Sequence, residues 1–508
     1  MATPLHSARA HRLRAIADER FDVLVIGGGI TGAGVARDAA RRGLRVALVE
    51  AEDFASGTSS RSSRLVHGGV RYLEHGYLHL VFEASRERRR LLQIAPHLVR
   101  RLHFTWPVYK GARIPRWKLA AGLTLYDTLA LFRNVGRHHR LSADGVREAE
   151  PALESAELTG GASYWDAATN DARLTLANVL DAAAHGAVVL NHARVAALTF
   201  GATGGSADGA VVRDARGGHE LRVRARLVVN ATGPWTDEIA RMEGAKDVAA
   251  VRGTKGVHIA VPADRVGNVG AVTMLSPDDG RVMFTLPSTA GLTIIGTTDT
   301  ATAEHPAEVR ASGADVRYLL SACNRFFPAA RLTEEDVVAA WAGIRPLVAT
   351  GNKGDPSSAS REHAIRHSPR GVLTVTGGKL TTYRAMAEQI VDAALERLGT
   401  ETRPCDTAEA LLPGERPPVS SGDELLVPEL PWRAQDVTAA VEQEFAESLA
   451  DVMIRRTTIA FELRDHGISL APRVAELMAP LLGWTSAGTE QAVREYGDEV
   501  ARIFEVTP

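Results

Sequence analysis

The stretch FDVLVIGGGITGAGVARDAARRGLRVALVE, residues 21–50, predicts the fold of the chain. It contains an apolar strand, a glycine turn, a helix and a second strand that ends in an acid, Glu50, which is the order that binds the ADP half of a dinucleotide. In such a turn Gly27 permits the tight bend, Gly29 admits the pyrophosphate, and Gly32 lets the helix pack on the strand. Glu50 would accept hydrogen bonds from the adenosine ribose and repel a 2′-phosphate, which argues against NADP.

Two further segments favour a flavin over a nicotinamide. Directly after the nucleotide acid, GTSSRSS at 57–63 places hydroxyl groups where they could surround the pyrophosphate or the flavin side chain. Far downstream, VTGGKLTTYR at 375–384 is a glycine turn that opens a helix, and the N–H groups and positive dipole end of such a helix suit the negative charge of a reduced flavin. Neither segment has a role in an NAD-dependent dehydrogenase. The sequence therefore predicts an FAD-binding protein.

The composition is that of an ordinary globular chain. Its 508 residues are 45% hydrophobic, and 59 basic against 61 acidic residues give a net charge of −2. This length predicts two or three domains, and the balanced charge argues against nucleic acid as a partner. Cys323 and Cys405 have neither metal-ligand spacing nor the pattern of a disulfide framework, so no metal site is expected and a reducing cytoplasm fits.

We expect an α/β fold in which a Rossmann-type FAD-binding domain is interleaved with a mainly β substrate domain, followed by an all-helical C-terminal domain. The FAD-dependent oxidoreductase region would span 21–398, with FAD-binding segments at about 21–75, 150–245 and 340–398 and substrate or cap segments at about 76–149 and 246–339. Residues 399–432, rich in proline, glycine, serine and glutamate, predict a linker, and helical periodicity predicts the C-terminal domain at 433–508.

Four other segments bear on location and surface. Residues 1–20 lack the apolar core of a signal peptide and predict a basic extension, helical or frayed, outside the fold. The apolar stretch Leu119–Phe132 is shorter than the about 20 residues that span a bilayer. Residues 100–119 mix basic and aromatic side chains, which is typical of a membrane-interface surface, although a basic loop before a buried helix is the favoured interpretation. The RERRR run at 86–90 is interpreted as a solvated helix face.

The chain resembles the bacterial FAD-dependent glycerol-3-phosphate dehydrogenases, respiratory relatives within the glycine-oxidase and amino-acid-oxidase superfamily. The motifs that carry the resemblance are VIGGGITGAGVARDAARRG, SSRLVHGGVRYLE, NATGPW, KGVHIAV, IIGTTD, GIRPL, GGKLTTYR and the tail PRVAELMAPLLGW, and together they cover nearly the whole chain. Arg64 stands where many relatives carry a lysine, which keeps the charge but changes its geometry.

The resemblance implies oxidation of sn-glycerol 3-phosphate to dihydroxyacetone phosphate in glycerol catabolism, with FAD as cofactor and a membrane quinone as electron acceptor. A phosphate monoester is nearly dianionic and requires several converging cations, and a histidine can move a proton near neutrality. The predicted catalytic residues are His258, Arg71, Arg345 and Lys379, and the predicted substrate-binding residues are Tyr72 and Arg361. The predicted cofactor-binding residues are Gly27, Gly29, Gly32, Glu50, Thr58, Ser59, Ser60, Ser63, His67, Gly68, Thr232, Gly233, Gly343, Gly378, Leu380 and Thr381.

Two alternatives stay open. The first is an oxidase that passes electrons to oxygen and releases hydrogen peroxide, and the second is a flavin-binding redox sensor without turnover. Converging cations and His258 argue against the sensor, whereas oxygen reactivity depends on access near the flavin, which the sequence does not show. The expected location is the cytoplasm, with peripheral contact to the inner face of the membrane left open. A homodimer, covalent attachment of FAD and the role of the helical tail are left open as well.

Overall fold

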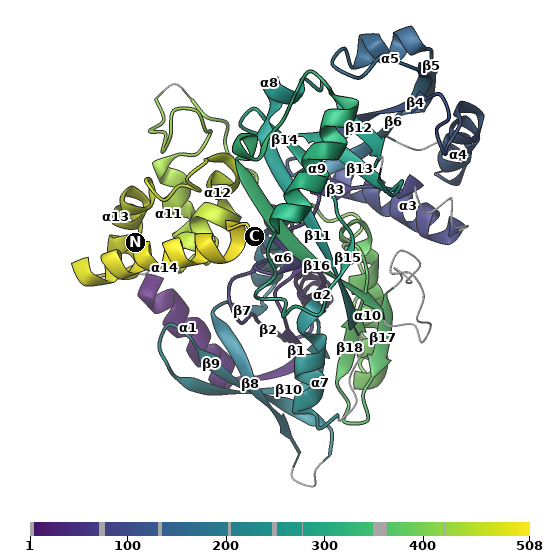
Figure 1. Ribbon diagram of the computed structural model, residues 1–508. Coiled ribbons are helices and arrows are strands. Elements are labelled where there is room, and N and C mark those ends of the chain that lie inside the picture. Colours follow the sequence, from purple (N-terminus) through teal and green to yellow (C-terminus); the bar gives the residue numbers. More distant parts are fainter. Residues whose placement is uncertain are drawn as a thin grey trace.

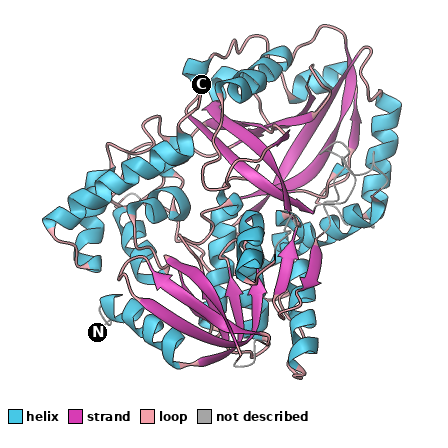
Figure 2. Cartoon of the chain, turned by 60° about the horizontal axis from the view of Figure 1, so that its bottom comes forward, coloured by secondary structure: helices cyan, strands magenta, loops and turns pink. Residues whose placement is uncertain are grey.

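The structure, a computed structural model, contains two large sheets and a group of C-terminal helices (Figure 1). It describes residues 5–70, 77–130, 135–201, 205–245, 251–276, 278–348, 363–420 and 422–508. Figure 2 shows the two sheets as separate blocks of strands, each flanked by helices. The predicted fold class, an interleaved α/β protein with a helical C-terminal part, is confirmed.

The first sheet contains the predicted nucleotide-binding unit. Its strand order is β17-β18-β10-β1-β2-β7, and β9 and β8 continue it from β10. The strands are β1 (Arg20–Ile26), β2 (Val46–Val49), β7 (Val188–Leu190), β8 (Ala193–Phe200), β9 (Ala207–Asp214), β10 (Glu220–Asn230), β17 (Ala364–His367) and β18 (Leu373–Thr376). On β1, Val23 and Val25 belong to one hydrophobic core, and Leu24 and Ile26 belong to another. Strand β1 is therefore buried on both faces, as a central parallel strand is.

Helices cover both faces of this sheet. They are α1 (Leu5–Asp18), α2 (Ile30–Arg41), α6 (Asp171–Ala184), α7 (Thr236–Met242) and α10 (Tyr383–Leu398). Helices α2, α6 and α10 contact one another, and α1 contacts β10 and β7. Ile16 of α1 is fully buried, and Arg9 is 7% exposed and donates to Asp214 of β9. The expectation that residues 1–20 lie outside the fold is therefore wrong, because α1 is part of this layer.

The second sheet adjoins the first and has the strand order β15-β11-β14-β13-β12-β4-β6-β3, with β16 paired to β11 and β5 paired to β6. Its strands are β3 (Leu65–Val66), β4 (Val99–Tyr109), β5 (His139–Leu141), β6 (Leu158–Thr169), β11 (Val251–Pro262), β12 (Ala271–Leu275), β13 (Val282–Pro287), β14 (Leu292–Gly296), β15 (Thr300–Ala301) and β16 (Ala339–Val348). Its helices are α3 (Leu78–Ile94), α4 (Arg116–Leu129), α5 (Ala143–Ala149), α8 (Ala263–Val266) and α9 (Gly313–Phe326). The predicted limits assigned residues 150–245 and 340–398 to the FAD-binding part. In the structure β6 and β16, which fall largely within these ranges, pair in the second sheet instead.

The C-terminal helices form one group at the left of Figure 1. They are α11 (Ala434–Gln443), the π-helix η7 (Asp451–Arg456), α12 (Ile459–Glu462), α13 (Ala471–Leu482) and α14 (Ser486–Phe504). Phe461 of α12 packs edge-to-face on Trp341 of β16, with ring centroids 5.2 Å apart, so this group continues the core of the second sheet. No helix or strand is assigned to the described residues between α10 and α11, but Leu412 in this segment is buried.

Two surface predictions differ from the structure. Within the RERRR run on α3, Glu87 and Arg88 are buried; Glu87 pairs with Arg384 of α10, and Arg88 pairs with Asp166 of β6. The run is therefore not simply a solvated face, because its inner side joins three elements. The expected basic loop before α4 is mostly the strand β4. Among the described residues, no helix has both the length and the apolarity needed to cross a membrane.

Candidate functional site

A cavity of about 520 Å³ lies at the carboxyl ends of β1, β2 and β18. Ligands of open parallel sheets bind at this edge. Sixteen of the predicted site residues line it, namely Gly27, Gly29, Glu50, Thr58, Ser59, Ser63, His67, Thr232, Gly233, His258, Gly343, Arg345, Gly378, Lys379, Leu380 and Thr381. Arg71, Tyr72 and Arg361 lie outside the described residues. The structure thus brings together residues from four distant parts of the sequence.

The glycine turn has the close approaches that a dinucleotide site requires. Gly27 has φ +105°, and a Cβ on it would lie 2.7 Å from the carbonyl oxygen of Ala231. A Cβ on Gly32 would lie 1.9 Å from the carbonyl oxygen of Gly27, so only glycine lets α2 pack this close. Helix α2 begins at Ile30 and its N-cap Gly29 provides no side-chain acceptor. The backbone at this positive helix end can therefore face a pyrophosphate, and the residues fit FAD.

The carboxylate of Glu50 is held against the same turn. Its Oε2 accepts a hydrogen bond from the backbone N–H of Gly28 at 2.6 Å, and its Oε1 accepts one from the N–H of Glu52 at 3.0 Å. Burial, and to a smaller degree the charges of Glu52 and Asp53, raise the pKa of Glu50 above its ordinary value. The acid that we expect to hold the ribose is thus fixed in position by backbone groups.

Hydrogen bonds tie the serine loop and the glycine-lysine turn to their neighbours. The hydroxyl of Thr58 donates to the carbonyl oxygen of Ile344 on β16 at 2.7 Å. The Oγ1 of Thr381 accepts from the N–H of His67 and donates to its carbonyl oxygen. Gly68 does not line the cavity; its N–H donates to Asp166, and a Cβ on it would lie 2.1 Å from the Tyr126 hydroxyl oxygen. Ser60 and Gly32 are buried and do not line the cavity.

His258 lies on β11 and is 2% exposed. Its Nε2 is 2.8 Å from the Oγ of Ser63, and its ring stacks on Trp341 at a centroid distance of 5.6 Å. Its Nδ1 has no hydrogen-bond partner within the described part of the chain. Burial, and then the positive charges of Arg345 and Arg64, lower the pKa of His258 to about 3. The imidazole is therefore neutral at pH 7.

Arg345 stands where two cavities meet. Its guanidinium pairs with Asp299 Oδ1 at 3.0 Å and donates to Thr297 Oγ1 at 2.9 Å. A second cavity of about 130 Å³ shares Ser63, Leu65, His67 and Arg345 with the larger one. Its remaining wall combines apolar and aromatic side chains with polar ones, and the polar ones are Asp166, Thr273, Arg281, Thr297 and Asp299. A small polar substrate could enter between the arginine and His258.

Three arginines in these walls are not among the predicted site residues, namely Arg61 and Arg194 in the larger cavity and Arg281 in the smaller one. Arg281 lines the smaller cavity and donates to the carbonyl oxygen of Asp299 at 2.6 Å. No motif marks it. Arg61 lines the larger cavity and is 5% exposed, and its buried Nε has no hydrogen-bond partner among the residues described. Burial, followed by the charge of Arg502, lowers the pKa of Arg61 to about 10. Its place inside the GTSSRSS loop is the sequence signal for it.

The fold and this cavity define a FAD-dependent oxidoreductase. The family model "FAD dependent oxidoreductase" matches residues 22–384, and the model "C-terminal domain of alpha-glycerophosphate oxidase" matches residues 380–489. The chain belongs to the family of FAD-dependent glycerol-3-phosphate dehydrogenases, and FAD is its cofactor. The resemblance inferred from the sequence motifs is confirmed.

Relatives support this assignment over nearly the full length. Glycerol-3-phosphate dehydrogenase 2 of Mycobacterium tuberculosis is 38% identical over 534 residues, which cover 96% of this chain and 89% of the relative. Glycerol-3-phosphate dehydrogenase of Synechocystis is 36% identical, with 95% and 96% covered. The solved structure of glycerol-3-phosphate dehydrogenase from Bacillus halodurans complexed with FAD has a TM-score of 0.78 at 30% identity and covers 97% of both chains. Glycine oxidase from Geobacillus kaustophilus, at 22% identity, a TM-score of 0.57 and coverage of 78% of this chain and 100% of its own, shares the fold.

Proposed function

We propose that this protein oxidises sn-glycerol 3-phosphate to dihydroxyacetone phosphate with FAD, and that a membrane quinone reoxidises the cofactor, in glycerol catabolism. The observation that best supports the substrate is the junction of the two cavities at Arg345, together with His258 and Lys379, which line the larger cavity. Arg281 adds a further cation on the side of the smaller cavity. A phosphate monoester requires such a group of cations, whereas glycerol does not.

In this proposal the phosphate binds beside Arg345, which is already oriented by Asp299 and Thr297. The C2 hydroxyl lies at Nε2 of His258, and Ser63 holds the imidazole through its 2.8 Å contact. A bound dianion opposes the effect of the neighbouring arginines and raises the pKa of His258, which makes the imidazole a better proton acceptor. Bound FAD would supply the acceptor for the hydride that leaves C2. The chain's own part is to bind the phosphate, orient the hydroxyl and take its proton at Nε2.

The surface of α3 and α4 supports contact with a membrane that holds the quinone. Trp117 is 74% exposed, and Leu78, Phe82 and Leu125 are each more than a third exposed on these two helices, which contact each other. Basic residues flank Trp117 at 116 and 118. Exposed apolar and aromatic side chains with basic neighbours are typical of a helix that lies at a membrane surface. Peripheral binding from the cytoplasmic side is part of the proposal.

The visible spectrum of the purified protein under argon tests the proposal. Addition of sn-glycerol 3-phosphate should bleach the oxidised-flavin band, and an equal concentration of glycerol should not. A soluble quinone should then restore the band faster than an equal concentration of dissolved oxygen. Faster recovery with oxygen, together with release of hydrogen peroxide, would favour the oxidase instead. A flavin band that no phosphorylated polyol bleaches would reject the substrate and favour the redox sensor.

A further inference from the structure

The segment that follows the nucleotide acid is bound to the C-terminal helical domain by buried charges. Asp53 lies three residues after Glu50 and is fully buried. Its Oδ2 accepts a hydrogen bond from Arg455 Nε at 2.5 Å and a second one from Arg456, both in η7. Its Oδ1 accepts from the side-chain amide of Asn191 at 2.9 Å. Both oxygens of the Asp53 carboxylate therefore have hydrogen-bond partners, and its positively charged partners come from the helical domain.

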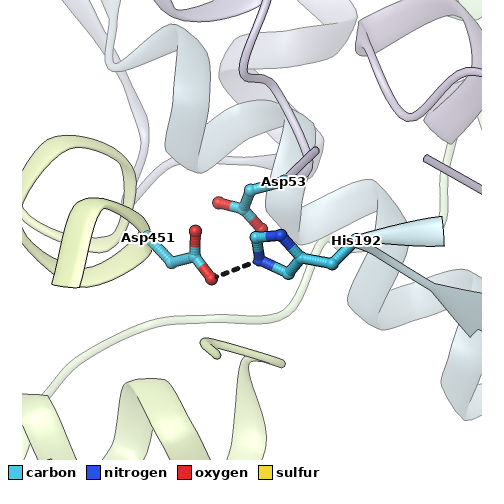
Figure 3. Close-up of side chains that lie close together, drawn as sticks. All are labelled: Asp53, His192 and Asp451. Atoms are coloured by element: carbon cyan, nitrogen blue, oxygen red, sulfur yellow. Dashed lines mark hydrogen bonds and ion pairs between the residues drawn. The ribbon is translucent and has the colours of Figure 1, made fainter. Parts of the chain in front are cut away.

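A second buried carboxylate completes this cluster. Asp451 of η7 accepts from Arg455 Nη2 at 2.8 Å and lies 2.9 Å from His192 Nε2, so that Asp53, His192 and Asp451 point toward one another (Figure 3). The three side chains could be mistaken for a metal site. Two arginines already balance the carboxylates, however, and a cation placed among them would be repelled. Burial alone would lower the pKa of Arg455, but Asp53 and Asp451 outweigh it and raise the pKa above its ordinary value.

The cluster reaches the FAD cavity through the backbone around Asp53. The carbonyl oxygen of Glu52 accepts from the N–H of His192, and that of Glu50 accepts from the N–H of Ala193. On the other side, Ala55 has φ +66° and donates its N–H to the carbonyl oxygen of Gly28 in the glycine turn. A non-glycine residue keeps this left-handed conformation only where its surroundings fix it. Residues 50–55 therefore span the distance from the helical domain to the dinucleotide turn.

Two further contacts link the same segment to the helical domain. Phe54 packs edge-to-face on Phe445, with ring centroids 6.1 Å apart, and a Cβ on Gly28 would lie 2.6 Å from the Phe54 ring. Arg502 of α14 pairs with Glu52 at 3.2 Å. Glu52 also lines the FAD cavity. Every residue from 52 to 54 thus has a partner in the helical domain.

We propose that the C-terminal helical domain positions the adenosine-binding segment for FAD, and that Asp53, Arg455 and Arg456 are the positioning residues. Loss of these contacts frees residues 50–55, so that Glu50 is no longer held at the turn and FAD affinity falls. Arg345 and His258 lie on β16 and β11, and none of the three positioning residues lines either cavity, so the substrate pocket should keep its geometry. The inference rests on FAD as cofactor and is independent of the substrate.

Titration of the FAD-free protein with FAD, followed by flavin fluorescence, tests the proposal. Arg455→Met should raise the Kd for FAD tenfold or more, Arg455→Lys should recover most of the affinity, and Arg494→Met, an exposed change on α14, should leave it unchanged. In FAD-saturated protein, the KM for sn-glycerol 3-phosphate should stay within twofold of the wild-type value for all three variants.

A second variant distinguishes the loss of FAD positioning from a general loss of folding. Arg502 is partly exposed, so Arg502→Gln should keep the fold and raise the Kd for FAD by a smaller factor of about three. Wild-type FAD affinity in both Arg455→Met and Arg502→Gln would overturn the proposal. An equal rise in Kd for FAD and in KM for substrate would also overturn it, because general destabilisation would then explain the result.

Discussion

The Oγ of Ser63 lies 2.8 Å from Nε2 of His258, although 195 residues separate them in sequence. Ser63 ends the serine loop that follows the nucleotide acid, and His258 lies on β11 of the second sheet. Both residues line the larger cavity, and Ser63 also lines the smaller one. This contact therefore joins the cofactor side of the site to the proposed substrate side.

Ser63→Ala should slow flavin reduction by the substrate about fivefold, because the loss of one hydrogen bond costs about 1 kcal/mol and the imidazole is then less well oriented. FAD should remain bound. Anaerobic stopped-flow absorbance measures the rate. Ser142→Ala, which removes a helix-capping hydroxyl in α5 that lines neither cavity, should leave the rate unchanged. A wild-type rate in Ser63→Ala would separate this contact from the chemistry.

The low pKa of His258 predicts a pH dependence of stability. The unfolded chain binds a proton at this residue near pH 6.5, and the folded protein binds it only near 3. Between these values the unfolded state holds more protons, so the free energy of unfolding falls as the pH is lowered from 6.5 toward 3. At pH 5 the contribution is about 2 kcal/mol.

Chemical unfolding of the wild type and of His258→Asn at pH 5 and 7.5 isolates this contribution, because other groups titrate equally in both proteins. The wild type should lose about 2 kcal/mol more than the variant on acidification. His139→Asn, at an exposed position, should behave like the wild type. Equal losses in the wild type and in His258→Asn would mean that the imidazole is solvated in the folded protein.

Arg345→Ala should raise the KM for sn-glycerol 3-phosphate roughly 10- to 100-fold, since charge-assisted hydrogen bonds to a phosphate contribute about 1.5–3 kcal/mol. Turnover of glycerol, which has no phosphate, should change little. Arg366→Ala on β17, whose arginine does not line either cavity, is the control. Steady-state kinetics with a soluble quinone measures both substrates. A normal KM in Arg345→Ala would remove this arginine from the phosphate site.

The cofactor half of the site could be predicted from the sequence because its signals are local. The tight turn at Gly27, the packing at Gly32 and the acid at Glu50 all lie within one βαβ unit, and each has a fixed spacing. The glycine turn before α10 carries its own signal as well. The backbone geometry that such a motif needs depends on only a few neighbouring residues, so the motif can be recognised before the fold is known.

The other features depend on residues that are far apart in the chain. Arg281 becomes part of a cavity wall only when β13 pairs with β14 and β12. Asp53 is paired with arginines of η7, and 402 residues separate it from Arg455 in sequence. Burial of Glu87 inside a basic run depends on Arg384 of α10. No local pattern contains these partners, so tertiary pairing decides what each charge does.

Gly32→Ala should abolish FAD binding and lower the free energy of unfolding by about 3 kcal/mol or more, because the added Cβ meets a backbone oxygen that cannot move aside. The 1.9 Å approach to the Gly27 carbonyl would force α2 away from β1. Gly122→Ala in α4 is the matched control, since a Cβ there meets open space, and it should stabilise the protein by about 0.5–1 kcal/mol. Chemical unfolding and FAD retention on gel filtration measure both effects. Normal retention in Gly32→Ala would show that the turn can relax.

Arg9→Met should lower the free energy of unfolding by roughly 3 kcal/mol, because it leaves the buried carboxylate of Asp214 without its cation. Arg9 Nη2 lies 2.7 Å from Asp214 Oδ1 and donates to the carbonyl oxygen of Asn191 at 3.0 Å. Burial alone would raise the pKa of Asp214, but the hydrogen bond and charge of Arg9 outweigh it and keep the pKa below its ordinary value. The stabilisation is therefore present at neutral pH and lost as the pH falls through that lowered pKa.

The matched control for this change is Arg14→Met, which removes an exposed arginine from the same helix α1. It should change the free energy of unfolding by less than about 0.5 kcal/mol. Chemical unfolding at pH 7.5 compares the two variants, and the KM for substrate should stay normal in both because α1 does not line either cavity. If Arg9→Met is as stable as Arg14→Met, then α1 covers the sheet without contributing to its stability, and Asp214 finds enough support in the backbone N–H groups of Arg216 and Gly217.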